Sequence, residues 1–306
     1  SNAYFNKDKE GTKYCAKVSK EVLTKASQQE KLLHEVLVLK NVVHPAVLEF
    51  KGFNLYDFEN TPHPTLITLY MENGSVQDFI DKKITLNDTQ KQIIIIGVAS
   101  AMRYLHYLKI AHCNLKPSNV LLDENYYPRI CDFGIKRKYS KDDYNVNISP
   151  EVVDKDIKQF EFDENQYNDI YSFAILCYQI ITGKSPFTGT CSKVYQKATQ
   201  TRTLSFDDKL EINKELKELI NDCYNCIKCD DKSKRPTFES IYSLLADDCN
   251  LVLNKHVDLS ELIKYVQHIE EKSPDLNNGL QICNLITHEY IGEYKDGVIP
   301  NAQDEI

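Results

Sequence analysis

The stretch His112-Cys113-Asn114-Leu115-Lys116-Pro117-Ser118-Asn119 is followed, thirteen residues after its last Asn, by Asp132-Phe133-Gly134. Further along, Ser149-Pro150-Glu151 completes a set of three short motifs. Each motif alone is weak evidence, because a pattern such as His-x-x-Leu-Lys-x-x-Asn also occurs in chance loops. Their order and spacing together make a chance occurrence negligible. These three segments therefore decide the fold assignment.

The composition is that of an ordinary globular protein. The chain has 306 residues, of which 42% are hydrophobic and 27% charged, enough for one large domain or two medium ones. Its net charge of −8 argues against nucleic acid or an anionic membrane as the main partner, because phosphates attract basic surfaces. The most apolar run, 93–99, is too short for a membrane segment. Ten scattered cysteines and the lack of a visible signal peptide favour a cytoplasmic setting.

The hydrophobic pattern predicts an α+β fold with two lobes. Strands are expected at 12–19, 47–53 and 65–70, with a helix after the first that ends before His44-Pro45. From Ser75 onward, helices are expected at 89–108, 169–182, 214–224 and 238–245. We therefore expect a small β-rich lobe at 4–72, a larger helical lobe at 73–246, and a C-terminal helical extension at 247–306. We set aside Ser1-Asn2-Ala3 as a tag remnant.

From about Tyr4 to about Leu245 the sequence resembles a protein kinase, on the strength of the motifs quoted above. The resemblance implies the bilobal kinase fold, a role in signalling, and ATP with Mg²⁺ as candidate ligands. Lys116 with Pro117-Ser118 is similar to serine/threonine kinases. The segments 70–75 and 235–238 look more like tyrosine kinases. This mixture is typical of the tyrosine-kinase-like branch.

The resemblance assigns ligand-binding roles to individual residues. Lys17 and Glu35 match the ion pair that holds the nucleotide phosphates, and Lys116 matches the catalytic-loop lysine. Asn119 and Asp132 match the metal ligands. The adenine would lie against residues of the hinge and the pocket floor, with Thr68 at the gatekeeper position: Thr68, Tyr70, Met71 and Leu121.

A second group of residues has structural roles in the family. Asp169 resembles the buried helix residue that holds the catalytic-loop backbone. Glu151 and Arg235 resemble an ion pair that joins two loops of the large lobe. An assembled kinase also contains a stacked column of four side chains, which here would be Leu39, Phe50, His112 and Phe133.

Four departures from the kinase pattern point in one direction. Asn114 stands where the catalytic Asp is expected. Without a general base, the activation barrier of phosphate transfer would be higher by about 3–5 kcal/mol. Cys113 replaces the Arg that grips an activation-loop phosphate in many kinases. The Gly-Thr pair expected before Ser149 is missing. No Gly-x-Gly-x-x-Gly precedes Lys17, so this sequence is expected to lack the first strand and the phosphate-covering loop, either because it was cut there or because the protein has neither.

These departures favour a pseudokinase that acts through protein partners, with ATP and Mg²⁺ bound weakly or not at all. Two alternatives stay open. The intact Lys17, Glu35, Asn119 and Asp132 would allow a slow serine/threonine kinase, because positioning and metal electrostatics carry much of phosphoryl transfer. A nucleotide-free scaffold is the other alternative.

The spacing Cys223-x-x-Cys226-x-x-Cys229 invites a zinc interpretation, but we do not expect zinc here. A structural zinc site needs four ligands, and no nearby His supplies the fourth. Cys223 and Cys226 share one face at a helix end, where buried cysteines behave as small hydrophobic residues.

Overall fold

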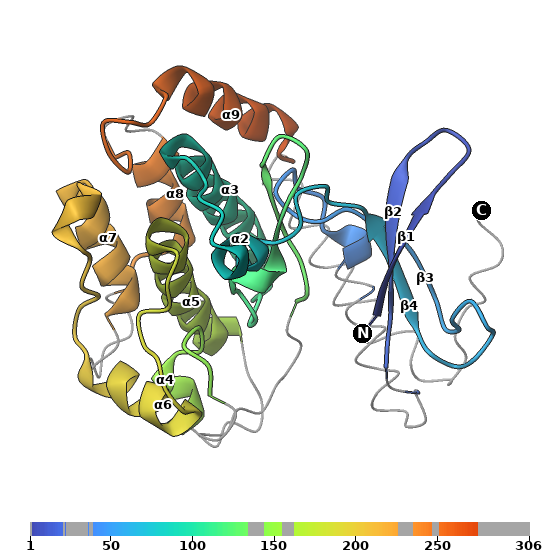
Figure 1. The fold of residues 1–306 in the computed structure, drawn as a ribbon, viewed down its shortest axis with the longest axis horizontal. Coiled ribbons are helices and arrows are strands. Elements are labelled where there is room, and N and C mark those ends of the chain that lie inside the picture. Colours follow the sequence, from blue (N-terminus) through green and yellow to red (C-terminus); the bar gives the residue numbers. More distant parts are fainter. Residues whose placement is uncertain are drawn as a thin grey trace. The chain divides into compact units, whose positions relative to one another are not determined.

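The computed structural model describes residues 2–20, 22, 36, 39–133, 144–154, 162–225, 235–246 and 251–274 (Figure 1). The chain divides into two compact units. The first contains the described residues of 2–43 and 48–71, and the second contains 44–47 and the described residues of 72–273. The predicted α+β class is confirmed, because the first unit holds an antiparallel sheet and the second is mainly helical.

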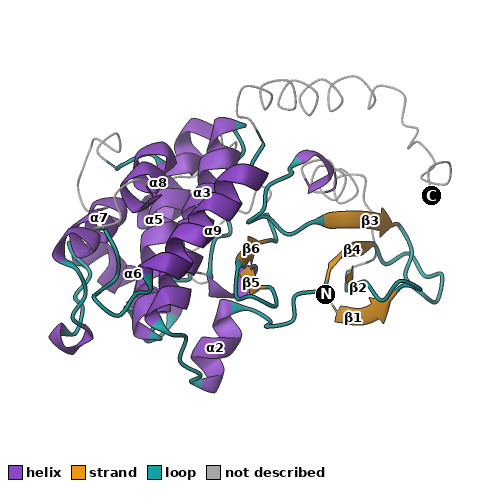
Figure 2. Cartoon of the chain, turned by 90° about the horizontal axis from the view of Figure 1, so that it is seen from above, coloured by secondary structure: helices purple, strands orange, loops and turns teal. Residues whose placement is uncertain are grey.

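The sheet of the first unit has four antiparallel strands in the order β1-β2-β4-β3 (Figure 2). The strands are β1 (Asn2–Lys7), β2 (Lys13–Val18), β3 (Phe50–Asn54) and β4 (Thr65–Leu69). The last three confirm the predicted strands. Setting aside the first residues was wrong, because Asn2 pairs with Val18 and Ala3 with Lys17 in β1. All six β1 residues are exposed, so the strand lacks the apolar alternation that marks a half-buried strand.

The second unit contains one small antiparallel sheet and the helical segments given below. The sheet pairs β5 (Val120–Leu122) with β6 (Pro128–Ile130). The helices and 3-10 turns are, in chain order, α2 (Val76–Lys82), α3 (Asp88–Tyr107), η1 (Pro117–Asn119), α4 (Pro150–Asp154), α5 (Phe162–Thr182), α6 (Cys191–Gln200), η2 (Asp208–Leu210), α7 (Lys214–Tyr224), α8 (Phe238–Ala246) and α9 (Leu259–Lys272). The predicted helices at 89–108, 214–224 and 238–245 are confirmed as α3, α7 and α8.

Helix α3 forms the core of the second unit. It begins at a capping box, in which Asn87 and Gln90 satisfy each other's backbone amides. The apolar run 93–99 is almost completely buried, because α8 and α9 both pack against α3 (Figure 1). The predicted helix at 169–182 is also found, but α5 begins earlier, at Phe162. No helix among the described residues has the length and apolar character needed to cross a bilayer.

The C-terminal region confirms one predicted element. Within the expected C-terminal helical extension, α9 buries Leu262, Tyr265 and Ile269 on one face. The part of the extension from residue 275 onward lies outside the described residues.

Candidate functional site

The candidate site is built on the loop 112–119 and the turn that follows β6. Two non-glycine residues in these segments have left-handed backbone conformations, Cys113 with φ 59° and Asp132 with φ 62°. Such conformations cost free energy in residues with a β-carbon and persist only where surrounding contacts hold them. The contacts that hold Cys113 come from Asp169.

Asp169 of α5 is completely buried and organises the loop backbone. Its carboxylate accepts hydrogen bonds from the amides of His112, at 2.8 Å, and Cys113, at 2.7 Å. The Nε2 atom of His106, in the last turn of α3, also lies 3.0 Å from Asp169 Oδ2. Asp169 therefore fixes the backbone of this loop through hydrogen bonds. His106 was missed, because its partner is far away in the sequence and no periodic pattern links the two.

Three predicted site residues meet through side-chain amides. Asn114 Nδ2 donates to Asp132 twice, to the carbonyl oxygen at 3.0 Å and to Oδ2 at 2.8 Å. Asn119 Nδ2 donates to the Asn114 carbonyl at 2.7 Å. The nitrogen end of the Asn114 amide thus faces the carboxylate, which is the attractive orientation, because two oxygens at this distance would repel.

Lys116 and Leu121 flank this group. Lys116 is half-buried and precedes η1, and its carbonyl accepts the Asn119 amide at 2.9 Å. Leu121 lies in β5, is half-buried, and forms an isolated antiparallel bridge with Ser75. The two residues therefore lie on either side of η1, the turn that contains Asn119.

His112 and Phe133, two residues of the expected column, contact each other with their ring planes tilted by 37°. Their ring centroids are 4.9 Å apart, and both side chains are buried. Burial lowers the pKa of His112, against the opposing effect of the Asp169 and Asp132 carboxylates. In the first unit, Leu39 is buried and Phe50 is half-buried. The complete column stays a prediction.

The environment of Cys113 is unsuited to an anion. Burial and the Asp169 carboxylate raise the pKa of this thiol well above its ordinary value. The neutral thiol therefore cannot replace the charge-assisted phosphate contact of an Arg. Of three residues that could be considered for phosphorylation, Tyr139 and Ser140 lie outside the described residues, and Tyr144 is only 2% exposed.

The segment before Ser149 is packed into the second unit. Asn147 Nδ2 donates to Gln179 Oε1 at 3.0 Å, and the Asn147 carbonyl accepts from the Ser172 hydroxyl at 2.6 Å. Ser149 is completely buried, and its amide donates to Asn168 Oδ1 at 2.9 Å. In this segment, which lacks the Gly-Thr pair, Asn147 is a buried residue with structural contacts.

Glu151 and Arg235 form the expected ion pair. Arg235 Nη1 lies 2.7 Å from Glu151 Oε1 and donates to the Tyr167 carbonyl, also at 2.7 Å. Its Nε donates to the Asn225 carbonyl at 3.1 Å. One buried guanidinium therefore joins α4 to the ends of α5 and α7.

The remaining predicted nucleotide-binding residues lie in the first unit. Lys17 is a β2 residue that pairs with Leu66 of β4, and Thr68 is a β4 residue. Tyr70 donates its amide to the Lys13 carbonyl at 3.0 Å, and Met71 follows it. Glu35 lies outside the described residues, so its pairing with Lys17 stays a prediction.

The oxygen donors of the turn fit a hard divalent cation. Asp132 offers a carboxylate, and Asn119 offers Oδ1 because its Nδ2 is used by the Asn114 carbonyl. Among the described residues no cluster of three or more His, Cys, Asp or Glu side chains could hold a metal. Cys223 is buried in α7 with a raised thiol pKa, while Cys226 and Cys229 lie outside the described residues.

Comparison with known proteins yields a family and many relatives. The family model described as protein kinase domain matches residues 3–244. Serine/threonine-protein kinase ULK3 of Xenopus laevis is 30% identical over 213 residues, which cover 66% of this chain and 43% of that protein. Death-associated protein kinase 2 of Mus musculus is 28% identical over 240 residues, 75% of this chain and 63% of that protein. The probable serine/threonine-protein kinase CCRP1 of Zea mays is 25% identical over 227 residues, 73% of this chain and 35% of that protein. The chain thus spans only part of each relative.

Proposed function

Because the chain belongs to the protein kinase family, we propose that it is a pseudokinase of the tyrosine-kinase-like branch that acts in signalling by binding protein partners. Its ligands would be ATP and Mg²⁺, bound more weakly than in an active kinase. Phosphoryl transfer would be lost or very slow. We place it in the cytoplasm, as its reduced cysteines suggest.

The contact between Asn114 and Asp132 carries this proposal. A general base needs a basic lone pair within hydrogen-bond reach of the proton it takes, and an amide has none. Here the Asn114 nitrogen is already engaged by the Asp132 carboxylate at 2.8 Å. The side chain at the position of the base therefore acts as a hydrogen-bond donor to the neighbouring metal ligand. Losing a general base lowers a rate by about 10²–10⁴-fold.

Residual nucleotide binding is supported by the residues that still match the metal and phosphate ligands of the family. Asp132 and Asn119 would hold Mg²⁺, which when bound neutralises phosphate charge. Lys17 and Lys116 would contact the phosphates. The Asn114 amide keeps the Asp132 carboxylate in a fixed position at its strained backbone. Metal binding has to replace or accommodate that hydrogen bond, so we expect weakened affinity.

A slow serine/threonine kinase is the second candidate. The relatives named above are serine/threonine kinases by name, which favours that substrate class if transfer occurs. The intact Asn119 and Asp132 are the observation behind it. This candidate requires a measurable wild-type rate that rises by orders of magnitude in Asn114→Asp.

Thermal unfolding with millimolar ATP and Mg²⁺ or Mn²⁺ tests ligand binding. A ligand that binds only the folded state stabilises it by RT ln(1 + [L]/Kd), so the proposal predicts a rise in the wild-type Tm. Asp132→Ala should abolish the metal-dependent part of that rise. Equal Tm values with and without nucleotide would replace the proposal by the third reading, a nucleotide-free scaffold.

A further inference from the structure

Ser273, which follows α9, lies beside a histidine from a distant part of the chain. Its Oγ is 3.0 Å from Nε2 of His44, and both residues belong to the second unit. His44 is only 6% exposed. Nδ1 of the same ring accepts a hydrogen bond from the Ala46 amide at 3.0 Å. Nδ1 therefore carries the lone pair and Nε2 the hydrogen, so the ring donates to a hydroxyl.

The imidazole has a second hydroxyl neighbour. Ser100 of α3 is completely buried, and its Oγ lies 3.3 Å from the same Nε2 atom of His44. One N–H group cannot make two strong hydrogen bonds, and the shorter distance favours Ser273 as its main acceptor. The orientation of His44 is thus set from two sides, by α3 and by the end of α9.

The loop 44–47 is hydrogen-bonded to β6, the strand that precedes the turn with Asp132. The Ala46 carbonyl accepts the Ile130 amide at 2.9 Å, and Val47 forms a parallel bridge with Ile130. These three residues are at most 3% exposed. The next amide, that of Cys131, donates to the carbonyl of Asn119 at 3.0 Å. Hydrogen bonds and peptide bonds therefore connect Ser273, through His44, Ala46 and Ile130, to the backbone of both candidate metal ligands.

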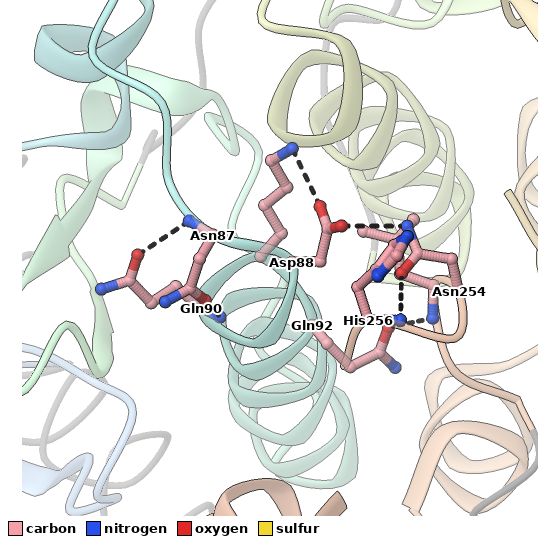
Figure 3. A network of polar contacts seen from close by, with 8 residues as sticks. Asn87, Asp88, Gln90, Gln92, Asn254 and His256 are labelled. Atoms are coloured by element: carbon pink, nitrogen blue, oxygen red, sulfur yellow. Dashed lines mark hydrogen bonds and ion pairs between the residues drawn. The ribbon is translucent and has the colours of Figure 1, made fainter. Parts of the chain in front are cut away.

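The segment before α9 is fixed to the start of α3 (Figure 3). The side-chain amide of Gln92, which is fully buried, donates to the Leu251 carbonyl at 3.3 Å and accepts the Leu253 amide at 2.9 Å. Asn254 Nδ2 donates to Asp88 Oδ2 at 3.0 Å. Buried side-chain amides bonded on both sides are costly to displace, so this segment is firmly anchored.

Helix α9 then runs alongside α3 to Ser273. The Asp258 amide donates to Thr89 Oγ1 at 2.8 Å where α9 begins, and His44 links Ser273 to Ser100 where it ends. At 1.5 Å per residue, Thr89 and Ser100 are about 17 Å apart along α3, and α9 is about 21 Å long. Because these lengths are similar, the anchoring of α9 at Asp258 places Ser273 next to His44.

We propose that Ser273 and His44 are positioning residues, through which the segment 251–273 sets the geometry of the turn that carries Asp132. This segment lies beyond the residues that the kinase family model matches. A protein partner that displaced the end of α9 would release His44, loosen the 44–47 loop and change the position of Asp132. The kinase-like site would then respond to events at the C-terminal end of the second unit.

Hydrogen exchange of the full chain, without nucleotide, tests this path. In Ser273→Ala, peptides that cover 44–47 and 129–132 should exchange about fivefold faster, the effect of losing one hydrogen bond. Ser260→Ala is the matched control, because this exposed serine of the same helix bonds only to Asp258 in the described contacts. The control should leave both peptides unchanged, and Ser273→Thr, which keeps the hydroxyl, should restore slow exchange.

Two results would overturn the inference. One is equal exchange of these peptides in Ser273→Ala and Ser260→Ala. The other is an acceleration that spreads equally over α6 and α7, because a general loss of stability is not a local path. The readout involves no nucleotide, so it fails or succeeds separately from the proposed function.

Discussion

Asn114 Nδ2 lies 2.8 Å from Asp132 Oδ2, a contact that a carboxylate at position 114 could not make. We predict that Asn114→Asp destabilises the metal-free protein by about 1 kcal/mol, because two partly exposed carboxylates would repel each other. A divalent cation should relieve that repulsion. Thermal unfolding with and without Mn²⁺ should therefore show a larger metal-induced rise in Tm for Asn114→Asp than for the wild type.

Asn114→Ala is the control for this comparison. It removes the hydrogen bond without adding a charge, so it should lose stability without gaining extra stabilisation from Mn²⁺. Equal Mn²⁺ responses in the wild type and in Asn114→Asp would show that position 114 does not influence the metal site.

The carboxylate of Asp169 is the second target. It is completely buried and accepts two backbone amides, whereas an Asn would offer one acceptor oxygen. We expect Asp169→Asn to lower the free energy of unfolding by about 2–4 kcal/mol, because one amide loses its partner. Urea denaturation measures this, with the exposed Asp208→Asn as control. A loss no greater than that of the control would contradict the role given to Asp169.

The pH dependence of stability should reveal His44. Burial lowers the pKa of His44 to about 3, with a smaller effect of Arg103 and Arg129. In the unfolded chain the imidazole takes up a proton near pH 6.5, whereas in the folded chain it does not. The contribution of His44 to the free energy of unfolding is therefore complete above pH 6.5. It is lost as the pH falls toward 3, at about 1.4 kcal/mol per pH unit.

His44→Gln should remove the part of the pH dependence of unfolding that is due to His44. The free energy of unfolding, measured from pH 7 to pH 4.5, should fall less steeply in the variant than in the wild type. His112, whose pKa is also lowered, contributes to both proteins and cancels in the difference. Parallel curves would mean that His44 is protonated in the folded state.

Gly97 of α3 lies next to Tyr265 of α9, with no room for a side chain. A β-carbon at this position would overlap Tyr265 Oη and the ring of Pro128. We predict that Gly97→Ala costs about 1–3 kcal/mol of stability through overpacking. The Tyr265 hydroxyl is buried and has no hydrogen-bond partner among the described residues, so Tyr265→Phe should change stability by less than about 1 kcal/mol.

The double variant Gly97→Ala with Tyr265→Phe tests whether the stability lost in Gly97→Ala comes from overlap with Tyr265. Tyr265→Phe removes one of the two overlapping groups, so it should recover part of the stability lost in Gly97→Ala. Strictly additive effects in urea denaturation would show that α9 is not packed against Gly97.

Much of this architecture follows from patterns that are local in sequence. Helices α3 and α7 were predicted because their apolar residues recur at helical spacing. Asp169 was assigned by its resemblance to the buried helix residue of the family. Strand β1 was missed because none of its residues is buried.

The contacts that matter most for function were not predictable in this way. His106 reaches Asp169 and Ser273 reaches His44 across long stretches of chain, and neither pair belongs to a periodic pattern. The amide contact of Asn114 depends on the left-handed conformation of Asp132. The identity of Asn114 indicated a missing base, but only the three-dimensional arrangement shows a donor directed at the metal ligand.

The most direct test of the central claim is phosphate transfer from ATP labelled at the γ-position, with Mg²⁺ or Mn²⁺, to the protein itself and to generic protein substrates. Wild type should transfer no more than Asp132→Ala, because Asn114 cannot accept the proton of the attacking hydroxyl. Clear wild-type transfer that disappears in Asp132→Ala and in Lys17→Ala would contradict the pseudokinase assignment and establish an active kinase.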